Sequence, residues 1–261
     1  MNLKGKSAVI TGSTSGIGKG LATKLAENGC NILINGFGDQ DVIEKQRKEL
    51  ESDHGVKVVY HGADMENVKE IEELILQAND AFDGIDILIN NAGIQHVSPV
   101  EDFPVDKWNS ILAINLSSAF HTIRCAVPYM KAKGWGRIIN IASAHALVAS
   151  PYKSAYVAAK HGMAGLTKSV ALEVAENKIT CNAICPGYVK TPLVENQIAD
   201  TAKARGIPEE DVVKTVMLAN QPTKEFVKID EIASMALYLS SDDAAGVTGT
   251  MLSIDGGWVA N

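Results

Sequence analysis

The sequence is poor in cysteine and in aromatic residues. Of its 261 residues 5% are aromatic, and the cysteines are Cys30, Cys125, Cys181 and Cys185. Four scattered cysteines exclude a disulfide scaffold, and the absence of a CxxC pair removes a common zinc and thiol-redox motif. No HExxH or comparable ligand cluster is present among the six histidines. We therefore expect buried, reduced thiols and no metal site.

Positive charge and long apolar runs are also lacking. The chain has 24 basic and 31 acidic residues, a formal net charge of −7, and so no net field that attracts nucleic acid or an anionic membrane. No apolar run approaches the roughly 18 residues of a membrane span, and no signal-peptide h-region follows the opening MNLKGK. We expect a cytoplasmic protein with no nucleic-acid or membrane partner, in which local groups hold any anionic ligand.

Short β-rich runs alternate with longer segments of helical period. The runs are apolar on both faces, as in a parallel sheet covered by helices on both sides. This pattern predicts one doubly wound, Rossmann-like α/β domain over 1–261 with a seven-stranded parallel sheet. The region at about 189–224, with mixed charge and three prolines, is the exception and is predicted to be a substrate lid. The expected strands are 7–11, 31–35, 57–61, 85–90, 136–142, 179–184 and 250–254.

A glycine-rich loop follows the first expected strand. Gly12, Gly16 and Gly18 lie in TGSTSGIG, which opens the first expected helix. Glycines there allow the backbone to approach a ligand, and the N–H groups at a helix start bind a pyrophosphate without lysine. A tight structural turn is the alternative, because glycine serves both purposes.

The region after the second expected strand favours NAD over NADP. A 2′-phosphate needs a cation, yet Ser15 occupies the loop position where an arginine would serve, and 30–44 contains no Lys or Arg. The acid expected at the strand end for a ribose hydroxyl is missing. Asn35, or backbone near Gly36 and Phe37, must then bind the ribose.

Tyr156 and Lys160 are four residues apart in a segment of helical character, so both project from one helical face. A neighbouring cation lowers the pKa of a phenol, which makes Tyr156 a candidate acid/base. Ser143 ends the fifth expected strand and can face the same cleft. Asn115, inside the helical stretch 105–133, is a candidate for holding a water near Lys160, although a polar residue satisfied within its helix is the simpler interpretation.

These motifs, together with NNAG at 90–93 and Pro186-Gly187, resemble the short-chain dehydrogenase/reductase family over nearly the whole chain. The resemblance implies hydride transfer with Tyr156 as acid/base, Ser143 orienting the substrate oxygen, Lys160 tuning Tyr156, and Asn115 supporting a proton-relay water. It also implies a homotetramer. The implied NAD-binding residues are Gly12, Thr14, Ser15, Gly16, Ile17, Gly18, Phe37, Asp64, Met65, Asn91, Ala92, Gly93, Tyr156, Lys160, Pro186, Gly187, Val189 and Thr191.

Polar residues around this set favour a small carboxylate substrate. Lys153 can neutralise the acid, and amide and imidazole groups can donate hydrogen bonds to it. The set resembles the bacterial D-3-hydroxybutyrate dehydrogenases of the family, which implies NAD-dependent interconversion of D-3-hydroxybutyrate and acetoacetate. Tyr188 replaces a tryptophan of that group and is expected to wall a methyl pocket. The candidate substrate residues are Gln95, Ser143, His145, Lys153, Tyr156, Tyr188 and Gln197.

Other functions remain open at this point. Within the family, a 3-oxoacyl thioester reductase or a polyol dehydrogenase would share these catalytic residues. A non-catalytic dinucleotide sensor would share the fold, although a pure binder has no need of Tyr156 and its cation. A serine hydrolase is disfavoured because the chain contains no GxSxG motif.

Overall fold

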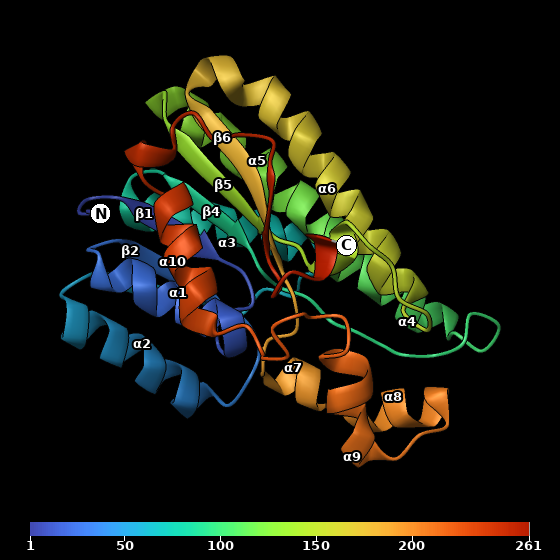
Figure 1. Cartoon of the computed structure of the whole chain (residues 1–261). Helices are drawn as coiled ribbons and strands as arrows, with labels where there is room; N and C mark the ends of the chain where they lie inside the picture. Colours follow the sequence, from blue (N-terminus) through green and yellow to red (C-terminus); the bar gives the residue numbers. More distant parts are fainter. Residues whose placement is uncertain (261) are drawn as a thin grey trace.

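The fold is built on a parallel sheet of seven strands, ordered β3-β2-β1-β4-β5-β6-β7 (Figure 1). The computed structural model describes residues 1–260. The prediction of a seven-stranded doubly wound sheet is confirmed, with strand ends within about two residues of the expected positions. The strands are β1 Ser7–Ile10, β2 Asn31–Asn35, β3 Val58–His61, β4 Ile87–Asn90, β5 Gly136–Ile141, β6 Ile179–Pro186 and β7 Met251–Ile254.

Helices cover both faces of this sheet. Successive strand residues point to opposite faces, so Ile10 packs into the layer beneath α1 and α10, and Val9 packs into the layer beneath α3 and α5. The first face carries α1 Gly16–Glu27, α2 Gln40–His54 and α10 Ile229–Leu239. The second carries α3 Val68–Phe82, α4 Val105–Leu112, α5 Ser118–Lys133 and α6 Ser154–Val174.

One continuous helical segment, Val105–Lys133, contains α4, a π-helical turn η1 at Ala113–Ser117, and α5. By length and composition alone it could cross a membrane. In the fold it packs against α3, α6, β4 and β5, which is the position of a core helix.

The segment at about 189–224 lies outside the sheet, next to the carboxyl ends of the strands (Figure 1). It contains α7 Pro192–Glu195, α8 Ile198–Arg205, α9 Glu209–Val212 and a π-helical turn η4 at Val213–Met217. Val212 and Met217 form a small apolar cluster with Tyr188 and Trp258. Short 3₁₀ turns are η2 Ala144–Ala146, η3 Ala175–Asn177, η5 Asp242–Ala244 and η6 Trp258–Ala260.

The strand order determines where a ligand binds. From β1 the chain builds outward through β2 to β3, and then returns to place β4 on the other side of β1. The loops after β1 and β4 therefore diverge at the carboxyl edge, which is where open α/β sheets bind ligands.

Candidate active site

The glycine-rich loop forms a backbone cradle at the start of α1. Gly12 and Gly16 have φ angles of +62° and +53°, a region that favours glycine. A Cβ at Gly12 would lie 2.9 Å from the Ala92 Cα, so the loop packs directly on the segment after β4. The N-cap residue Ser15 makes no side-chain hydrogen bond to the helix start. The first N–H groups of α1 are thus left for an anion, and the cradle fits a pyrophosphate.

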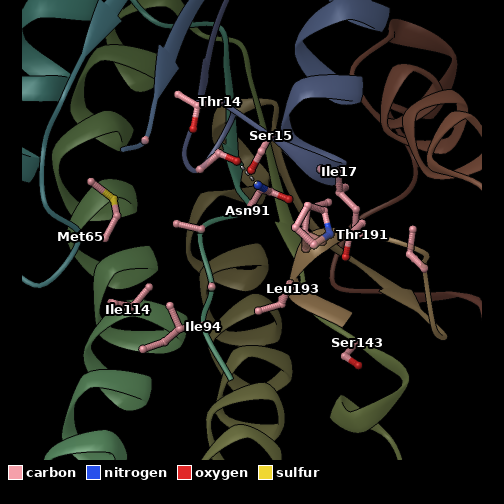
Figure 2. A pocket seen from close by; sticks show the side chains of 18 of the residues that line it. Thr14, Ser15, Ile17, Met65, Asn91, Ile94, Ile114, Ser143, Thr191 and Leu193 are labelled. Carbon is pink, nitrogen blue, oxygen red and sulfur yellow. Dashed lines mark hydrogen bonds between the residues drawn. The ribbon is translucent and has the colours of Figure 1, made fainter. Parts of the chain in front are cut away.

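A cleft of about 350 Å³ begins at this cradle and follows the carboxyl edge of the sheet (Figure 2). Figure 2 shows Thr14 and Ser15 at one end, Met65 and Ile114 on one wall, and Thr191 and Leu193 on the other. All the residues predicted to bind the dinucleotide line this cleft, except Gly18. Asn35 and Gly36, the two positions considered for ribose binding, also line the cleft. Sequence reasoning did not identify Ala63, Ile94, Ile114, Ile141, Ala142, Pro192 and Leu193, which line it as well.

Gly18 has a different role from the one predicted. It lies inside α1 with its Cα against the Gly12 carbonyl and the Asn91 side chain, where any Cβ would collide. Gly18 therefore allows the helix to pack closely on the loop and does not face the cleft.

At the end of β2, the Asn35 side chain already has protein partners. The Asn35 side chain accepts a hydrogen bond from the Gly12 N–H and donates to the carbonyls of His61 and Ala63. Both of its N–H groups are used by these contacts, and the side chain joins β1, β2 and the loop after β3. The acidic side chain expected at the end of this strand is absent because Gly36 has no room for a side chain. A Cβ at this position would lie 2.5 Å from the Thr14 Oγ1.

Tyr156 and Lys160 both face the cleft from α6, with the Lys160 Nζ 5.4 Å from the Tyr156 ring centroid. The Lys160 Nζ donates to the Ile141 carbonyl at 2.8 Å, which ties α6 to the end of β5. Burial lowers the pKa of Lys160 to about 8, because the charged form loses its hydration.

The pKa of Tyr156 differs from the expectation. Burial raises it to about 12, and a hydrogen bond with Ser143 acts in the opposite direction. In the protein alone, Lys160 does not lower the phenol's pKa below its ordinary value. The protein group that favours the phenolate is Ser143.

Asn115 occupies the π-helical turn η1 and is fully buried. Its Oδ1 accepts from the Ile94 N–H and its Nδ2 donates to the Ile94 carbonyl, both at 2.9 Å. The side chain therefore fixes the segment after β4.

A second, smaller cavity of about 50 Å³ adjoins the cleft at Tyr156 and Ser143. The structure brings all seven candidate substrate residues to its wall. The amide nitrogen and oxygen of Gln95 are buried there, and neither has a hydrogen-bond partner within the described residues. Such a group is expected to bind a ligand, because an unpaired buried amide is costly.

Lys153 is the cation of this cavity and is 6% exposed. Its Nζ donates to the Tyr188 hydroxyl at 3.0 Å and to the Gln197 Oε1 at 3.2 Å. The Gln197 Nε2 donates to the Leu193 carbonyl. Gln197 thus presents its oxygen to Lys153, and is not arranged as the carboxylate donor that was predicted.

His145 also departs from its predicted role. Its Nδ1 contacts the Ser143 Oγ at 3.3 Å and its Nε2 contacts the Ser150 Oγ at 2.9 Å. Burial lowers the pKa of His145 to about 3, so the ring is neutral. With both nitrogens engaged, His145 is not free to donate to a carboxylate and instead orients Ser143.

Trp258 lines the small cavity and was missed at the sequence level. Its ring stacks on Tyr188 with an interplanar angle of 6°, and it contacts His145 edge-on. Trp258 lies 70 positions after Tyr188 and follows β7, so only the pairing of β6 with β7 brings the two rings together. No local signal in the sequence indicates this contact.

Comparison with known proteins agrees with this arrangement. The family model described as enoyl-(acyl carrier protein) reductase matches residues 12–259. A D-beta-hydroxybutyrate dehydrogenase of Rhizobium meliloti is 60% identical over 255 residues, which cover 98% of this chain and 99% of that protein. Another, of Cupriavidus necator, is 54% identical over 99% of both chains. The crystal structure of levodione reductase superposes with a TM-score of 0.90 at 30% identity, over 99% of both chains.

Proposed function

Because this chain belongs to the short-chain dehydrogenase/reductase family, we propose that it catalyses the reversible, NAD-dependent oxidation of D-3-hydroxybutyrate to acetoacetate. The observation that carries the proposal is the environment of Lys153. Its ammonium is buried beside Tyr156, and no ion pair within residues 1–260 involves it. A buried cation without an acidic partner favours an anionic ligand.

The size of the cavity supports a short acid. About 50 Å³ next to Tyr156 and Ser143 suits a few-carbon substrate and has no room for a long acyl chain. A neutral polyol would leave Lys153 uncompensated. The two relatives of highest identity given above are named D-beta-hydroxybutyrate dehydrogenases, which favours this acid over other short 3-hydroxy acids.

NAD is proposed as the dinucleotide because the described residues at the adenosine end include no cation for a 2′-phosphate. Residues 30–44 contain no Lys or Arg, and Ser15 contributes only a hydroxyl. Since both N–H groups of Asn35 are used, we propose that main-chain groups near Gly36 and Phe37 bind the ribose.

Three side chains, those of Tyr156, Ser143 and Lys160, carry separate parts of the proposed reaction. NAD supplies the hydride acceptor when it is bound. Tyr156 takes the proton of the substrate hydroxyl, and Ser143, oriented by His145, holds the same oxygen by a hydrogen bond. Lys160, with a pKa of about 8, passes the proton on to water on the side of the cleft near Asn115.

The α7–α9 segment is proposed to act as the lid. Thr191, Pro192 and Leu193 line the dinucleotide cleft, while Gln197 lines the small cavity. One short segment therefore covers both ligands, and its closure excludes water from the reacting atoms.

We also propose a cytoplasmic homotetramer that binds neither nucleic acid nor a membrane. Phe120 on α5 and Leu172 on α6 are 48% and 83% exposed, and such apolar side chains on outer helices suit contacts between subunits. Sedimentation velocity measures the oligomeric state directly.

The function is tested by following NADH formation with each enantiomer of 3-hydroxybutyrate. We expect turnover with the D enantiomer and NAD, and a much lower kcat/KM with NADP. Xylitol and a 3-oxoacyl thioester with NADPH serve as the competing substrates. A higher kcat/KM for either of them would refute the proposed substrate.

A further inference from the structure

We infer that Tyr188 determines specificity for the acid: its hydroxyl accepts a hydrogen bond from Lys153 and donates its own proton to the substrate carboxylate. The inference rests on the proposed function, because it concerns the carboxylate of that substrate. It also replaces the expected role of Tyr188 as the wall of a methyl pocket.

The position of the Tyr188 hydroxyl is fixed from several sides. The Tyr188 N–H donates to the Gln221 Oε1, and its carbonyl accepts from the Val227 N–H at 2.9 Å. Its ring stacks on Trp258 with the centroids 5.7 Å apart. One face of the Tyr188 ring therefore packs on Trp258, while its hydroxyl group contacts the Lys153 Nζ.

The direction of the hydroxyl proton follows from its partner. An ammonium can only donate, so in the 3.0 Å contact the Tyr188 oxygen is the acceptor. Within residues 1–260 this hydroxyl makes no other hydrogen bond, and its own proton therefore remains available. The adjacent charge polarises the O–H group and makes it a stronger donor.

A carboxylate matches this pair of donors. The Lys153 Nζ and the Tyr188 oxygen are 3.0 Å apart, so each can donate to one oxygen of the same carboxylate. The unpaired Gln95 amide lines the same cavity and supplies a further donor. Among residues 1–260 no acidic side chain lines the cavity, so the carboxylate of the substrate would supply the negative charge opposite Lys153.

The test is the binding of acetoacetate to the enzyme saturated with NAD, measured by calorimetry. Both ligands are oxidised, so no turnover occurs. We expect Tyr188→Phe to raise the Kd for acetoacetate about tenfold, because it removes one hydrogen bond to a charged group. Methyl acetoacetate, which lacks the charge, should bind the wild type and the variant equally. KM for D-3-hydroxybutyrate should rise in parallel with an unchanged kcat.

Tyr238→Phe is the matched control, because it removes a phenolic hydroxyl from α10, away from both cavities. An unchanged Kd for NAD shows that Tyr188→Phe is folded. An unchanged Kd for acetoacetate in Tyr188→Phe would overturn this inference and leave the proposed function intact. An equal loss of affinity for methyl acetoacetate would have the same consequence. Failure of the wild type to bind acetoacetate would overturn the proposed function and this inference with it.

Discussion

Replacing Lys160 by methionine is expected to stabilise the folded protein at neutral pH while it abolishes turnover. Lys160 is 4% exposed, its ammonium has no acidic partner in the described chain, and burial lowers its pKa from 10.5 to about 8. The charged lysine therefore costs folding free energy. Methionine has a similar length and suits an apolar environment.

The size of the effect follows from the two pKa values. The difference between 10.5 in the unfolded chain and about 8 in the folded chain corresponds to about 3 kcal/mol, at about 1.36 kcal/mol per pH unit. The methionine variant also loses the hydrogen bond to the Ile141 carbonyl, which lowers its free energy of unfolding by about 1 kcal/mol. A net stabilisation of about 2 kcal/mol at neutral pH remains.

The pH dependence has a defined sign. Below pH 8 Lys160 is charged in both states and its full penalty applies. Between about 8 and 10.5 the unfolded chain holds one more proton than the folded chain, so this group makes stability rise with pH. The advantage of Lys160→Met should shrink across this window. Above it the charge penalty is gone and only the lost hydrogen bond remains, so the variant should be less stable than the wild type by about 1 kcal/mol.

Urea unfolding of the wild type and Lys160→Met, at one protein concentration and without NAD, measures this difference. The free energy of unfolding of each protein is measured near neutral pH and near pH 10. The difference between the two proteins is then compared between the two pH values, so that titrating groups common to both proteins cancel. A Lys160→Met variant that is less stable at neutral pH, or an advantage independent of pH, would show that the lysine is not held in a costly charged form.

Three further outcomes are expected. Tyr156→Phe should abolish turnover and leave the Kd for NAD within about twofold, since the phenol is the acid/base and the cradle at α1 is untouched; an active variant would remove Tyr156 from the mechanism. Lys153→Ala should raise KM for D-3-hydroxybutyrate roughly tenfold or more with little change in the Kd for NAD, and an unchanged KM would refute the carboxylate contact. The pH profile of kcat/KM should show no inflection near 6.5 from His145, whose pKa is about 3, and an inflection there that His145→Gln removes would contradict its neutral role.

Much of the fold and the catalytic group could be predicted from the sequence. The apolar strand runs predicted the parallel sheet, because buried strands carry no polar face. TGSTSGIG after the first strand and the four-residue spacing of Tyr156 and Lys160 are local patterns. Local geometry decides where their backbone and side chains point, so these assignments required no knowledge of long-range contacts.

The tertiary structure decided which polar groups are free. Asn35, Asn115 and His145 looked available as ligands, yet the side chain of each is hydrogen-bonded to protein groups that the fold places against it. The stacking of Trp258 on Tyr188 depends on the pairing of two strands far apart in the sequence. Hydrogen-bond capacity and desolvation are properties of the packed environment, and the sequence by itself determined only the residue types that meet there.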